Sequence, residues 1–346
     1  MTVPPSAYKN AGVDIDAKYR AVLDAKDAIR ATFTKGVMGD VGQFGGLFDP
    51  RAAGVEGQVL VASTDGVGTK VKVAQMTQDV SSVGEDLVNH CVDDILVQGA
   101  RPLFFLDYVA IGKMVPERVT QVISGVARAC KQNDCALLGG ETAEMPGVYV
   151  EGEFDVAGTL IGCVQRDKIL DGSRVRAGQV ALALPSSGLH TNGYSLARHI
   201  CFAQLGHGID DRPDELGGQT VGEALLAVHR SYLKALWPLL EDDLIAGMAH
   251  ITGGGLPDNI PRVLPAGVAV EIEVGAVPAP PIFAYLVAKG GVGRAEACRV
   301  FNMGFGMVLF VDAAHADDIV RRLAARGEAC HRVGRVVPGA REVILR

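Results

Sequence analysis

The chain alternates apolar segments of strand length with amphipathic segments of helix length, and several strand segments end in glycine and a carboxylate. The first such boundary is VASTDGVGTK, residues 61–70, where Asp65 follows an apolar run and precedes two glycines. Strands that alternate with helices predict a layered α/β fold. At 346 residues the chain exceeds the usual size of one hydrophobic core, so we expect two domains.

Hydrophobic periodicity places the expected elements along the whole chain. In the first half these are a helix over Asp16–Phe33, strands over Gln58–Thr64 and Leu103–Ile111, helices over Gly84–Gln98 and Glu117–Gln132, a short strand over Ala136–Leu138 and a strand over Asp155–Val164. In the second half they are a strand over Val180–Leu184, a helix from Tyr194, a helix over Val221–Leu240, a strand within 301–311 and a helix over Ala316–Ala325. Apolar density falls at RDKILDGSRVRAG, residues 166–178, so we divide the domains into 1–168 and 169–346.

Composition excludes several classes of protein. A net charge of −7 argues against a nucleic-acid-binding surface, so an anionic ligand must be held by local amides, cations or a metal. No segment approaches the about 20 apolar residues of a membrane span, and the first residues lack the pattern of an export signal. The seven scattered cysteines fit reduced thiols, so we expect a cytoplasmic protein without membrane attachment.

The segment VASTDGVGTK is not a Walker phosphate loop, because only Val67 separates its two glycines and Thr69 precedes Lys70. A carboxylate at a strand end can instead bind Mg²⁺, a hard ion that takes carboxylate, phosphate and water oxygens. Lys70 could then contact a phosphate. The alternative is a plain turn, in which Asp65 caps backbone amides and Lys70 is solvated.

The helical segment GEDLVNHCVDDILVQGA, residues 84–100, carries a polar arc of about 140°. Its members are Asp86, Asn89, His90, Asp93 and Asp94. Such an arc usually faces water. Adjacent Asp93 and Asp94 have no Lys or Arg near them in the sequence, however, and their repulsion favours a bound cation.

A third segment, LLGGETAEMPG, again follows a short strand with glycines and acids, Glu141 and Glu144. Two strand-end acids and one helix-borne acid could converge on a metal–nucleotide complex, where catalysis would consist of stabilising charge on phosphoryl oxygens. The alternative for Glu141 is a loop carboxylate paired with a turn amide.

In PSSGLHTNGYSLARHI, residues 185–200, we expect Thr191 or Asn192 to cap the helix that begins near Tyr194. Exposed amides at such a helix start can bind phosphate. His190 could then act as an acid, a base or a hydrogen-bond donor, although a loop histidine can also be merely solvated. His250 offers a second imidazole beside a glycine loop. We interpret His199 and His229, which lie in helical patterns, as surface or packing residues.

Taken together, these segments resemble the phosphoribosylformylglycinamidine cyclo-ligase family, also called aminoimidazole ribonucleotide synthetases. The resemblance rests on residues 61–70, CVDDILVQGA (91–100), PLFFLDY (102–108), GGETAEMPG (139–147), SSGLHTNGYSL (186–196), HITGGG (250–255) and FNMGFGM (301–307). It extends from AGVDIDA at residues 11–17 to the C-terminal strand. One departure is Asp93, where the family more often has Asn, which leaves the role of Asp93 open.

The resemblance implies an α/β (α+β) protein of two domains. The N-terminal domain would bind ATP and pair across a homodimer, so that its mixed sheet completes a barrel, while the C-terminal sheet packs with helices and contributes substrate and phosphate contacts. It also implies specific site residues. The metal ligands would be Asp65, Asp94 and Glu141, and the catalytic residues His190, Lys70 and Glu141. ATP and Mg²⁺ would lie against Gly42, Gly45, Gly46, Thr64, Asp65, Gly66, Gly68, Thr69, Lys70, Gly139 and Gly140. The substrate would lie against Ser187, Gly188, His190, Thr191, Asn192, His250, Thr252 and Gly253.

The implied reaction is an ATP-dependent cyclisation of formylglycinamidine ribonucleotide. ATP would phosphorylate the formyl amide oxygen, and the amidine nitrogen would then close the imidazole ring and expel phosphate. No nucleophilic side chain is needed.

Three competing functions make different demands on the sequence. A selenophosphate synthetase would carry a reactive Cys before the glycine-rich loop, but the first cysteine is Cys91. A thiamin-phosphate kinase would phosphorylate its substrate without closing a ring, and the segments GGETAEMPG and SSGLHTNGYSL disfavour it. A non-catalytic regulator would bind ATP without turnover, whereas Asp65, Lys70, Asp94, Glu141 and His190 together favour retained chemistry.

Overall fold

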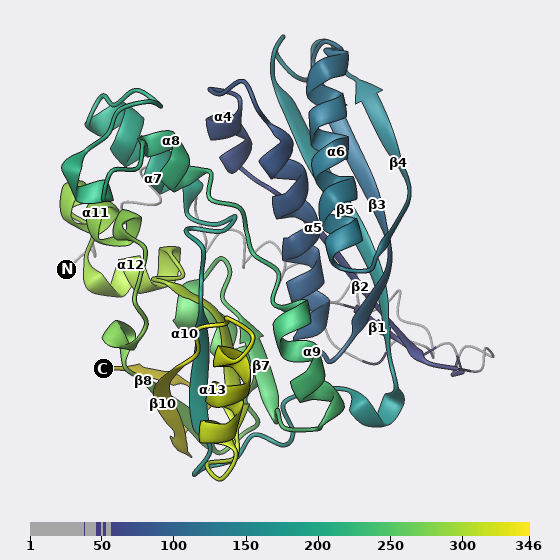
Figure 1. Ribbon diagram of the computed structural model, residues 1–346, viewed down its shortest axis with the longest axis vertical. Helices are drawn as coiled ribbons and strands as arrows, with labels where there is room; N and C mark the ends of the chain where they lie inside the picture. Colours follow the sequence, from purple (N-terminus) through teal and green to yellow (C-terminus); the bar gives the residue numbers. More distant parts are fainter. Residues whose placement is uncertain (1–37, 39–45, 50, 53–56) are drawn as a thin grey trace, which may run out of the picture.

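The computed structural model describes residues 38, 46–49, 51–52 and 57–346. Two β-sheets with attached helices lie side by side, and the long helix α5 (Ser81–Leu96) runs between them (Figure 1). The mixed α/β class with two sheets is confirmed. The helix expected over Asp16–Phe33, and the candidate residues Gly42 and Gly45, lie outside the described residues.

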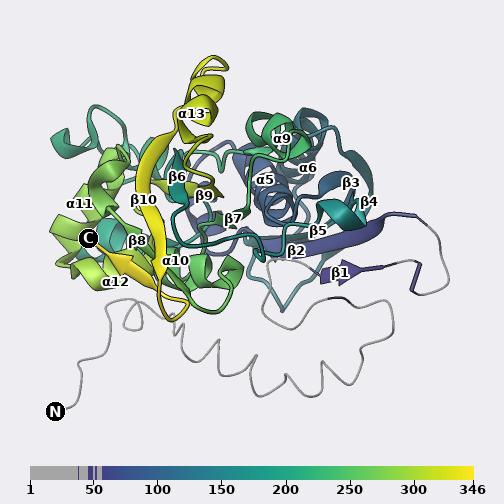
Figure 2. The ribbon, with the colours of Figure 1, turned by 90° about the horizontal axis from the view of Figure 1, so that it is seen from below.

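The first sheet has the strand order β1-β2-β5-β3-β4. All neighbours are antiparallel except β3 and β4, which are parallel and are connected by helix α6 (Pro116–Gln132). Helices α5 and α6 cover one face of this sheet, as Figures 1 and 2 show. The strands are β1 (Gly46–Phe48), β2 (Val59–Gly66), β3 (Arg101–Ile111), β4 (Ala136–Glu144) and β5 (Phe154–Val164).

Helices α5 and α6 touch backbone to backbone. A Cβ atom placed on Gly84 would lie 2.2 Å from the carbonyl oxygen of Val122, and one on Gly125 would lie 1.9 Å from that of Ser81. Only glycine permits so close a contact at both positions. The contact fixes α5 against the sheet and therefore fixes the side chains that α5 presents to the second half of the chain.

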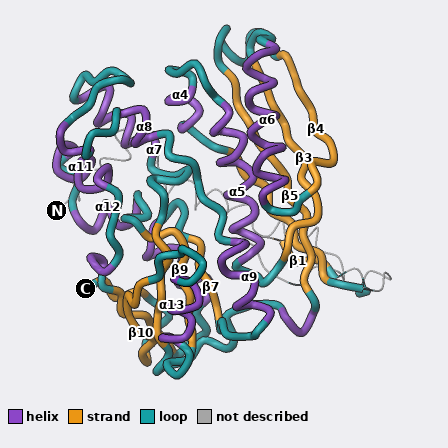
Figure 3. Tube along the Cα trace, viewed as in Figure 1, coloured by secondary structure: helices purple, strands orange, loops and turns teal. Residues whose placement is uncertain are grey.

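The second sheet has the order β11-β8-β10-β6-β9-β7, with β11 and β8 parallel and the other neighbours antiparallel. Figure 3 shows it as the lower group of strands, flanked by shorter helices. Its strands are β6 (Val180–Pro185), β7 (Gly247–His250), β8 (Val268–Ile272), β9 (Phe305–Val311), β10 (His331–Pro338) and β11 (Val343–Leu345).

The remaining α-helices of the described chain are α4 (Lys70–Ala74) before α5, then α7 (Tyr194–Arg198), α8 (Val221–Leu225), α9 (Leu233–Glu241), α10 (Gly255–Asn259), α11 (Pro281–Gly290), α12 (Arg294–Val300) and α13 (Ala316–Ala324).

Two sequence-based expectations are wrong in instructive ways. The short strand expected over Ala136–Leu138 continues as β4 to Glu144, because Gly139 and Gly140 pair with β3 and do not form a loop. The single helix expected over Val221–Leu240 is two helices, α8 and α9. They are separated by an extended segment, residues 227–232, that we call the strap.

Within the described part of the chain, the helices are all too short or too polar to cross a lipid bilayer.

Candidate active site at the junction of the two sheets

The polar arc of α5 does not face water. Asp86, Asn89, His90, Asp93 and Asp94 are all buried. They have partners in both halves of the chain, while the apolar side of α5 packs on β2 and β5. Because buried polar groups need partners, this helix face depends on the contacts that the second half adds.

The strap supplies three of these partners through its backbone. The amide of His229 donates to Asp86 Oδ1 over 2.7 Å, and the carbonyl of His229 accepts from Asn89 Nδ2 over 2.7 Å. The amide of Tyr232 donates to Asp93 Oδ1 over 2.9 Å. The backbone groups that a helix would pair internally are thus satisfied by α5, which explains why the helical pattern of 221–240 is interrupted here.

Asp65 and Asp94 meet at the imidazole of His90. Nε2 of His90 lies 2.8 Å from Asp65 Oδ2 and 3.5 Å from Asp94 Oδ2. Burial alone would lower the pKa of His90, but the two carboxylates raise it well above its ordinary value. Burial likewise opposes ionisation of Asp65 and Asp94, yet His90 keeps the pKa of both acids low. Two acids from distant segments therefore share the positive charge of His90. Of the two acids, Asp65 is the more accessible, with a side chain that is 41% exposed.

A closed ring of hydrogen bonds extends from these acids into the interior. His90 Nδ1 lies 2.6 Å from Thr191 Oγ1, which lies 3.4 Å from His229 Nδ1. His229 Nε2 lies 3.1 Å from His250 Nε2, and His250 Nδ1 lies 2.8 Å from Asp94 Oδ1. One assignment of protons satisfies all four contacts: His90 donates to Thr191, Thr191 to His229, His229 to His250, and His250 to Asp94.

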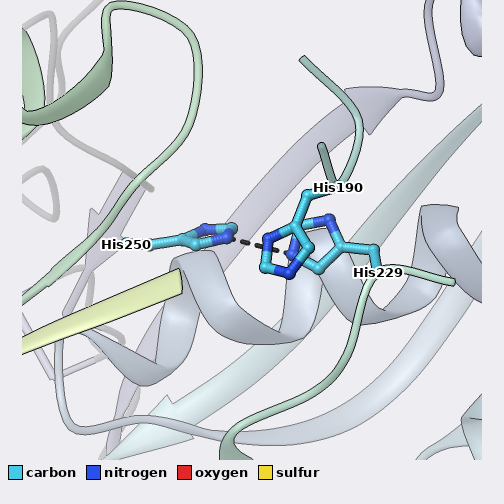
Figure 4. Close-up of side chains that lie close together, drawn as sticks. All are labelled: His190, His229 and His250. Atoms are coloured by element: carbon cyan, nitrogen blue, oxygen red, sulfur yellow. Dashed lines mark hydrogen bonds between the residues drawn. The ribbon is translucent and has the colours of Figure 1, made fainter. Parts of the chain in front are cut away.

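His190 lies against this ring. Its imidazole stacks on that of His229 with centroids 3.9 Å apart and planes inclined by 16° (Figure 4). Its backbone has φ +60°, an uncommon conformation for a residue with a side chain. Burial lowers the pKa of His190 well below its ordinary value. Nε2 accepts from the amide of Ser187 over 3.3 Å, whereas Nδ1 has no hydrogen-bond partner within the described chain.

Two groups of side chains among the described residues are close enough to hold a metal ion. One comprises His190, His229 and His250, and the other His90, Asp94 and His250. A lone pair on imidazole nitrogen lies in the ring plane, so the stacked rings of His190 and His229 cannot both point at one ion. The acids Asp65 and Asp94 offer the hard oxygen ligands that Mg²⁺ prefers.

Lys70 does not lie where a phosphate contact was expected. Its ammonium is fully buried and lies 2.8 Å from Asp86 Oδ1, 3.1 Å from the carbonyl oxygen of His190 and 2.8 Å from that of Ala227. Burial lowers the pKa of Lys70 and raises that of Asp86, and each charge opposes the shift of the other. All three ammonium hydrogens have acceptors, so Lys70 connects α4 to α5 and to the second half.

Glu141 does not join Asp65 and Asp94. The register across the sheet runs from Asp65 to Gly158, then to Asp107 and to Gly140, the neighbour of Glu141. Three strand spacings of about 4.8 Å separate β2 from β4 by about 14 Å. Glu141 is exposed on the edge strand, so the structure does not support a single ion shared by all three acids within one chain.

The loops expected to contact substrate do come together. A Cβ atom on Gly253 would lie 3.0 Å from Asn192 Oδ1, so the segments around residues 190 and 250 are adjacent. Thr191 and His250 belong to the ring, whereas the Thr252 hydroxyl donates to Asn259. The cap of α7 differs from expectation, because it is Gly193 (φ +79°) and not Thr191 or Asn192. The Thr191 hydroxyl instead forms hydrogen bonds with the rings of His90 and His229.

The remaining candidates are distributed over both halves. Thr64 Oγ1 lies 2.8 Å from Thr159 Oγ1 on an exposed part of the sheet, and Thr69 Oγ1 lies 3.2 Å from Ser195 Oγ of α7. The Ser187 hydroxyl donates to the carbonyl of Val228 in the strap. Gly66 ends β2, Gly68 follows with φ +62°, Gly46 lies in β1, Gly139 and Gly140 lie in β4, and Gly188 accepts a hydrogen bond from Asn302.

Comparison with known proteins assigns both halves. Residues 49–164 match the N-terminal domain of AIR synthase related proteins, and residues 176–345 match the C-terminal domain. A phosphoribosylformylglycinamidine cyclo-ligase of Bifidobacterium animalis subsp. lactis is 47% identical over 98% of each chain. Another, of Desulfitobacterium hafniense, is 50% identical over 95% of this chain and 96% of that one. The chain belongs to the phosphoribosylformylglycinamidine cyclo-ligase family. It is therefore a ligase.

More distant solved structures share the fold of this cyclo-ligase family member. A thiamine-monophosphate kinase from Stenotrophomonas maltophilia superimposes with a TM-score of 0.62 at 19% identity, covering 94% of this chain and 95% of the other. The hydrogenase maturation protein HypE in complex with ATP gives 0.61 at 19% identity, covering 83% and 81%. At these identities the likeness concerns the fold alone.

Sequence reasoning missed His229 and undervalued His90 in this family member. His90 was visible as part of the polar arc, four residues before Asp94, where helical spacing makes the two side chains neighbours. His229 had no local signal, because the surrounding sequence has helical periodicity and contains neither Gly nor Pro between Leu225 and Trp237. Its role depends on α5, which lies about 140 positions earlier in the chain.

Proposed function

We propose that the chain catalyses the ATP-dependent cyclisation of formylglycinamidine ribonucleotide to aminoimidazole ribonucleotide, with release of ADP and phosphate, in de novo purine biosynthesis. The names of the relatives support this reaction. The observation that carries it is the meeting of Asp65 and Asp94 at His90, where two acids from separate segments surround one positive charge. A site of this kind fits a ligand that combines a divalent cation with phosphate groups.

Asp65 and Asp94 would hold Mg²⁺, and Asp65 is the member of the pair that reaches solvent. When bound, the ion supplies positive charge that offsets the charge developing on the phosphoryl oxygens. The residues of the chain then orient the reactants. His250 holds Asp94 by a hydrogen bond and so fixes one ligand, as outer hydrogen-bond partners do at metal sites.

The reaction has two steps that balance. The formyl amide oxygen forms a bond to the γ-phosphorus of ATP, and ADP leaves. The amidine nitrogen then bonds to the activated carbon, the carbon–oxygen bond breaks, phosphate leaves, and the nitrogen loses a proton. We assign the contact with the reacting amide to His190, because its ring is neutral and Nδ1 is unpartnered in the described structure.

The proposal divides the work between the halves. Residues 1–168 would bind ATP and Mg²⁺ through Asp65 and Asp94, and residues 169–346 would contact the substrate through the loops around His190 and His250. The ring of hydrogen bonds crosses this division at Thr191, His229 and His250, which supports a site shared by both halves. The seven free thiols are consistent with the cytoplasmic location that we propose.

The proposed partner is a second copy of the chain, which would cover the outer face of the first sheet. Leu106 and Tyr108 of β3 point to that face and are 39% and 37% exposed. Leu138, Val148 and Val150 nearby are 63% to 69% exposed. Helices α5 and α6 cover only the opposite face, and large exposed apolar patches mark association surfaces.

The test is a coupled assay on the purified chain with ATP, Mg²⁺ and formylglycinamidine ribonucleotide. ADP should appear in step with the aminoimidazole product. Absence of substrate-dependent ADP release at saturating ligands would reject the reaction. Nucleotide binding without turnover would favour the regulator, and ADP release that depends on thiamin monophosphate would favour the kinase.

A further inference from the structure

A cavity lies between the two halves, beside α9. Its volume is about 300 Å³, at the lower end of the range of about 300–1,000 Å³ for small-ligand sites. The first half contributes Arg101, Cys163 and Lys168, and the second contributes Trp237 and Leu240. None of these residues belongs to the site around Asp65 and Asp94.

Two segments of the chain pack closely at the wall of this cavity. Gly99, with φ +77°, lets the chain after α5 approach the segment that leads out of the first sheet. A Cβ atom on Gly99 would lie 2.8 Å from the carbonyl oxygen of Lys168. Leu170 and Leu240 add apolar surface, and Trp237 adds the large ring of the chain's one tryptophan. The indole Nε1 donates to the carboxylate of Glu241 over 3.0 Å, and Glu241 also lines the cavity.

The charges of the cavity do not cancel. Arg174 is engaged by Asp243 at 2.6 Å and by the carbonyl of Ile245 at 2.6 Å. Among the described residues, however, Arg101 and Lys168 have no carboxylate within ion-pair distance. Glu241 adds one negative charge, so the three cations and two carboxylates of the lining leave a net charge of +1. This excess beside apolar surface suits a ligand with an anionic group attached to an apolar, flat one.

We propose that this cavity is a second ligand site, and that it binds a small aromatic anion of the nucleoside monophosphate class. Arg101 and Lys168 hold the phosphate, and the ring lies in the apolar part beside Trp237. Both halves contribute to the cavity, so the bound anion contacts both. The proposal does not depend on the reaction catalysed at the other site.

Trp237 makes the test direct, because it is the one tryptophan of the chain and lines this cavity. The full chain is first given Mg²⁺ and the ATP analogue AMPPCP, so that the other nucleotide site is occupied. AMP, adenosine and inorganic phosphate are then titrated separately, with calorimetry on the same samples. We expect AMP to give a saturable change in emission and a heat of binding, and adenosine and phosphate to bind at least about tenfold more weakly.

Variants locate the site. Arg101→Gln and Lys168→Gln should each weaken AMP binding by about 10-fold to 100-fold, as expected for a lost charged hydrogen bond. Lys113→Gln is the matched control, because Lys113 follows the far end of β3, the strand that begins at Arg101. This variant should bind AMP with the affinity of the parent. Arg101→Gln should retain the parent's substrate-dependent ADP release.

Four results would overturn the proposal. They are no AMP binding by either method up to millimolar concentrations, loss of AMP binding when AMPPCP is present, phosphate affinity equal to that of AMP, or unchanged AMP affinity in both glutamine variants.

Discussion

The ammonium nitrogen of Lys70 lies 2.8 Å from Oδ1 of Asp86, and neither side chain has any exposed surface. The pair joins two helices of the first half to the second half, because Lys70 also donates to the carbonyls of His190 and Ala227. A buried ion pair contributes little relative to apolar residues of the same shape, but removal of one partner leaves an uncompensated charge.

Asp86→Ala should therefore lower the free energy of unfolding by about 3–5 kcal/mol. The loss includes the acceptor of the His229 amide. Glu85→Ala, one position earlier, is the control. Glu85 pairs with the partly exposed Arg128, so its loss should cost less than about 1 kcal/mol. Urea unfolding measures both, and equal midpoints for the two variants would contradict the interior role of Asp86.

His229→Gln should change how stability depends on pH. Burial lowers the pKa of His229 well below 6.5, so the unfolded chain binds a proton that the folded ring does not. The stability that this difference provides is present above about pH 6.5 and is lost as the pH falls toward the folded-state pKa. Below pH 6.5, the deficit of the variant relative to the parent should shrink by about 1.4 kcal/mol per pH unit. Urea unfolding at pH 7.5, 6 and 5 tests this; a constant deficit would show that folding does not lower the pKa of His229.

Asp94→Asn should reduce Mg²⁺-dependent turnover by about 100-fold, the scale of one lost electrostatic contact in a catalytic site. The amide oxygen can still accept from Ser63 or from His250, so the fold should be disturbed far less than the activity. ADP release as a function of Mg²⁺ concentration gives the result, with Asp155→Asn, an exposed acid of β5, as control. Activity equal to that of the parent would remove Asp94 from the metal site.

Gly125→Ala should destabilise the protein by about 1–3 kcal/mol, the usual cost of overpacking. Alanine in a helix interior is about 1 kcal/mol more favourable than glycine, which opposes this loss. A net decrease in the free energy of unfolding would therefore show that the contact with Ser81 cannot relax. Gly275→Ala is the control, because its Cβ would have no atom within 4 Å. An increase in the urea midpoint of Gly125→Ala would show that α5 and α6 can separate at no cost.

Leu106→Arg should convert the proposed dimer to a monomer. The parent should scatter light as a particle of twice the 36.3 kDa chain mass, and the variant as a single chain. A charge that is desolvated in an apolar interface is costly. Met76→Arg is the control, because Met76 is 45% exposed but follows α4 and does not belong to any strand of this sheet. A monomeric parent would reject the second copy as the partner of this face.

Local sequence patterns predicted the α/β class and the boundaries of α5 and α6 within a few residues, whereas the pairing of Asp65 with Asp94 was implied by the family resemblance. These features depend on periodicity and on strand ends, which short windows contain. Asp65 ends a buried strand, and Asp94 lies on the polar arc of α5, the helix whose apolar side packs on that strand. Their meeting therefore required only that this helix pack on that strand.

The position of Glu141 could not be predicted from such patterns. It depends on strand order, because α6 returns the chain to the outer side of β3 and makes β4 an edge strand. Lys70 illustrates a second limit. Its sequence neighbours resemble a phosphate loop, but its partner Asp86 lies one helix further along the chain, and the burial of the pair results from tertiary packing.

The strap also determines how the two halves can move. A hinge requires backbone that can rotate. In the strap, however, the peptide groups of His229 and Tyr232 are hydrogen-bonded to side chains of α5, and Lys70 donates to the carbonyl of Ala227. Any opening of the halves must pivot at residues 165–179, which connect β5 to β6, and must first detach an entire row of backbone contacts. Substrate entry then costs less through displacement of surface loops than through separation of the two lobes.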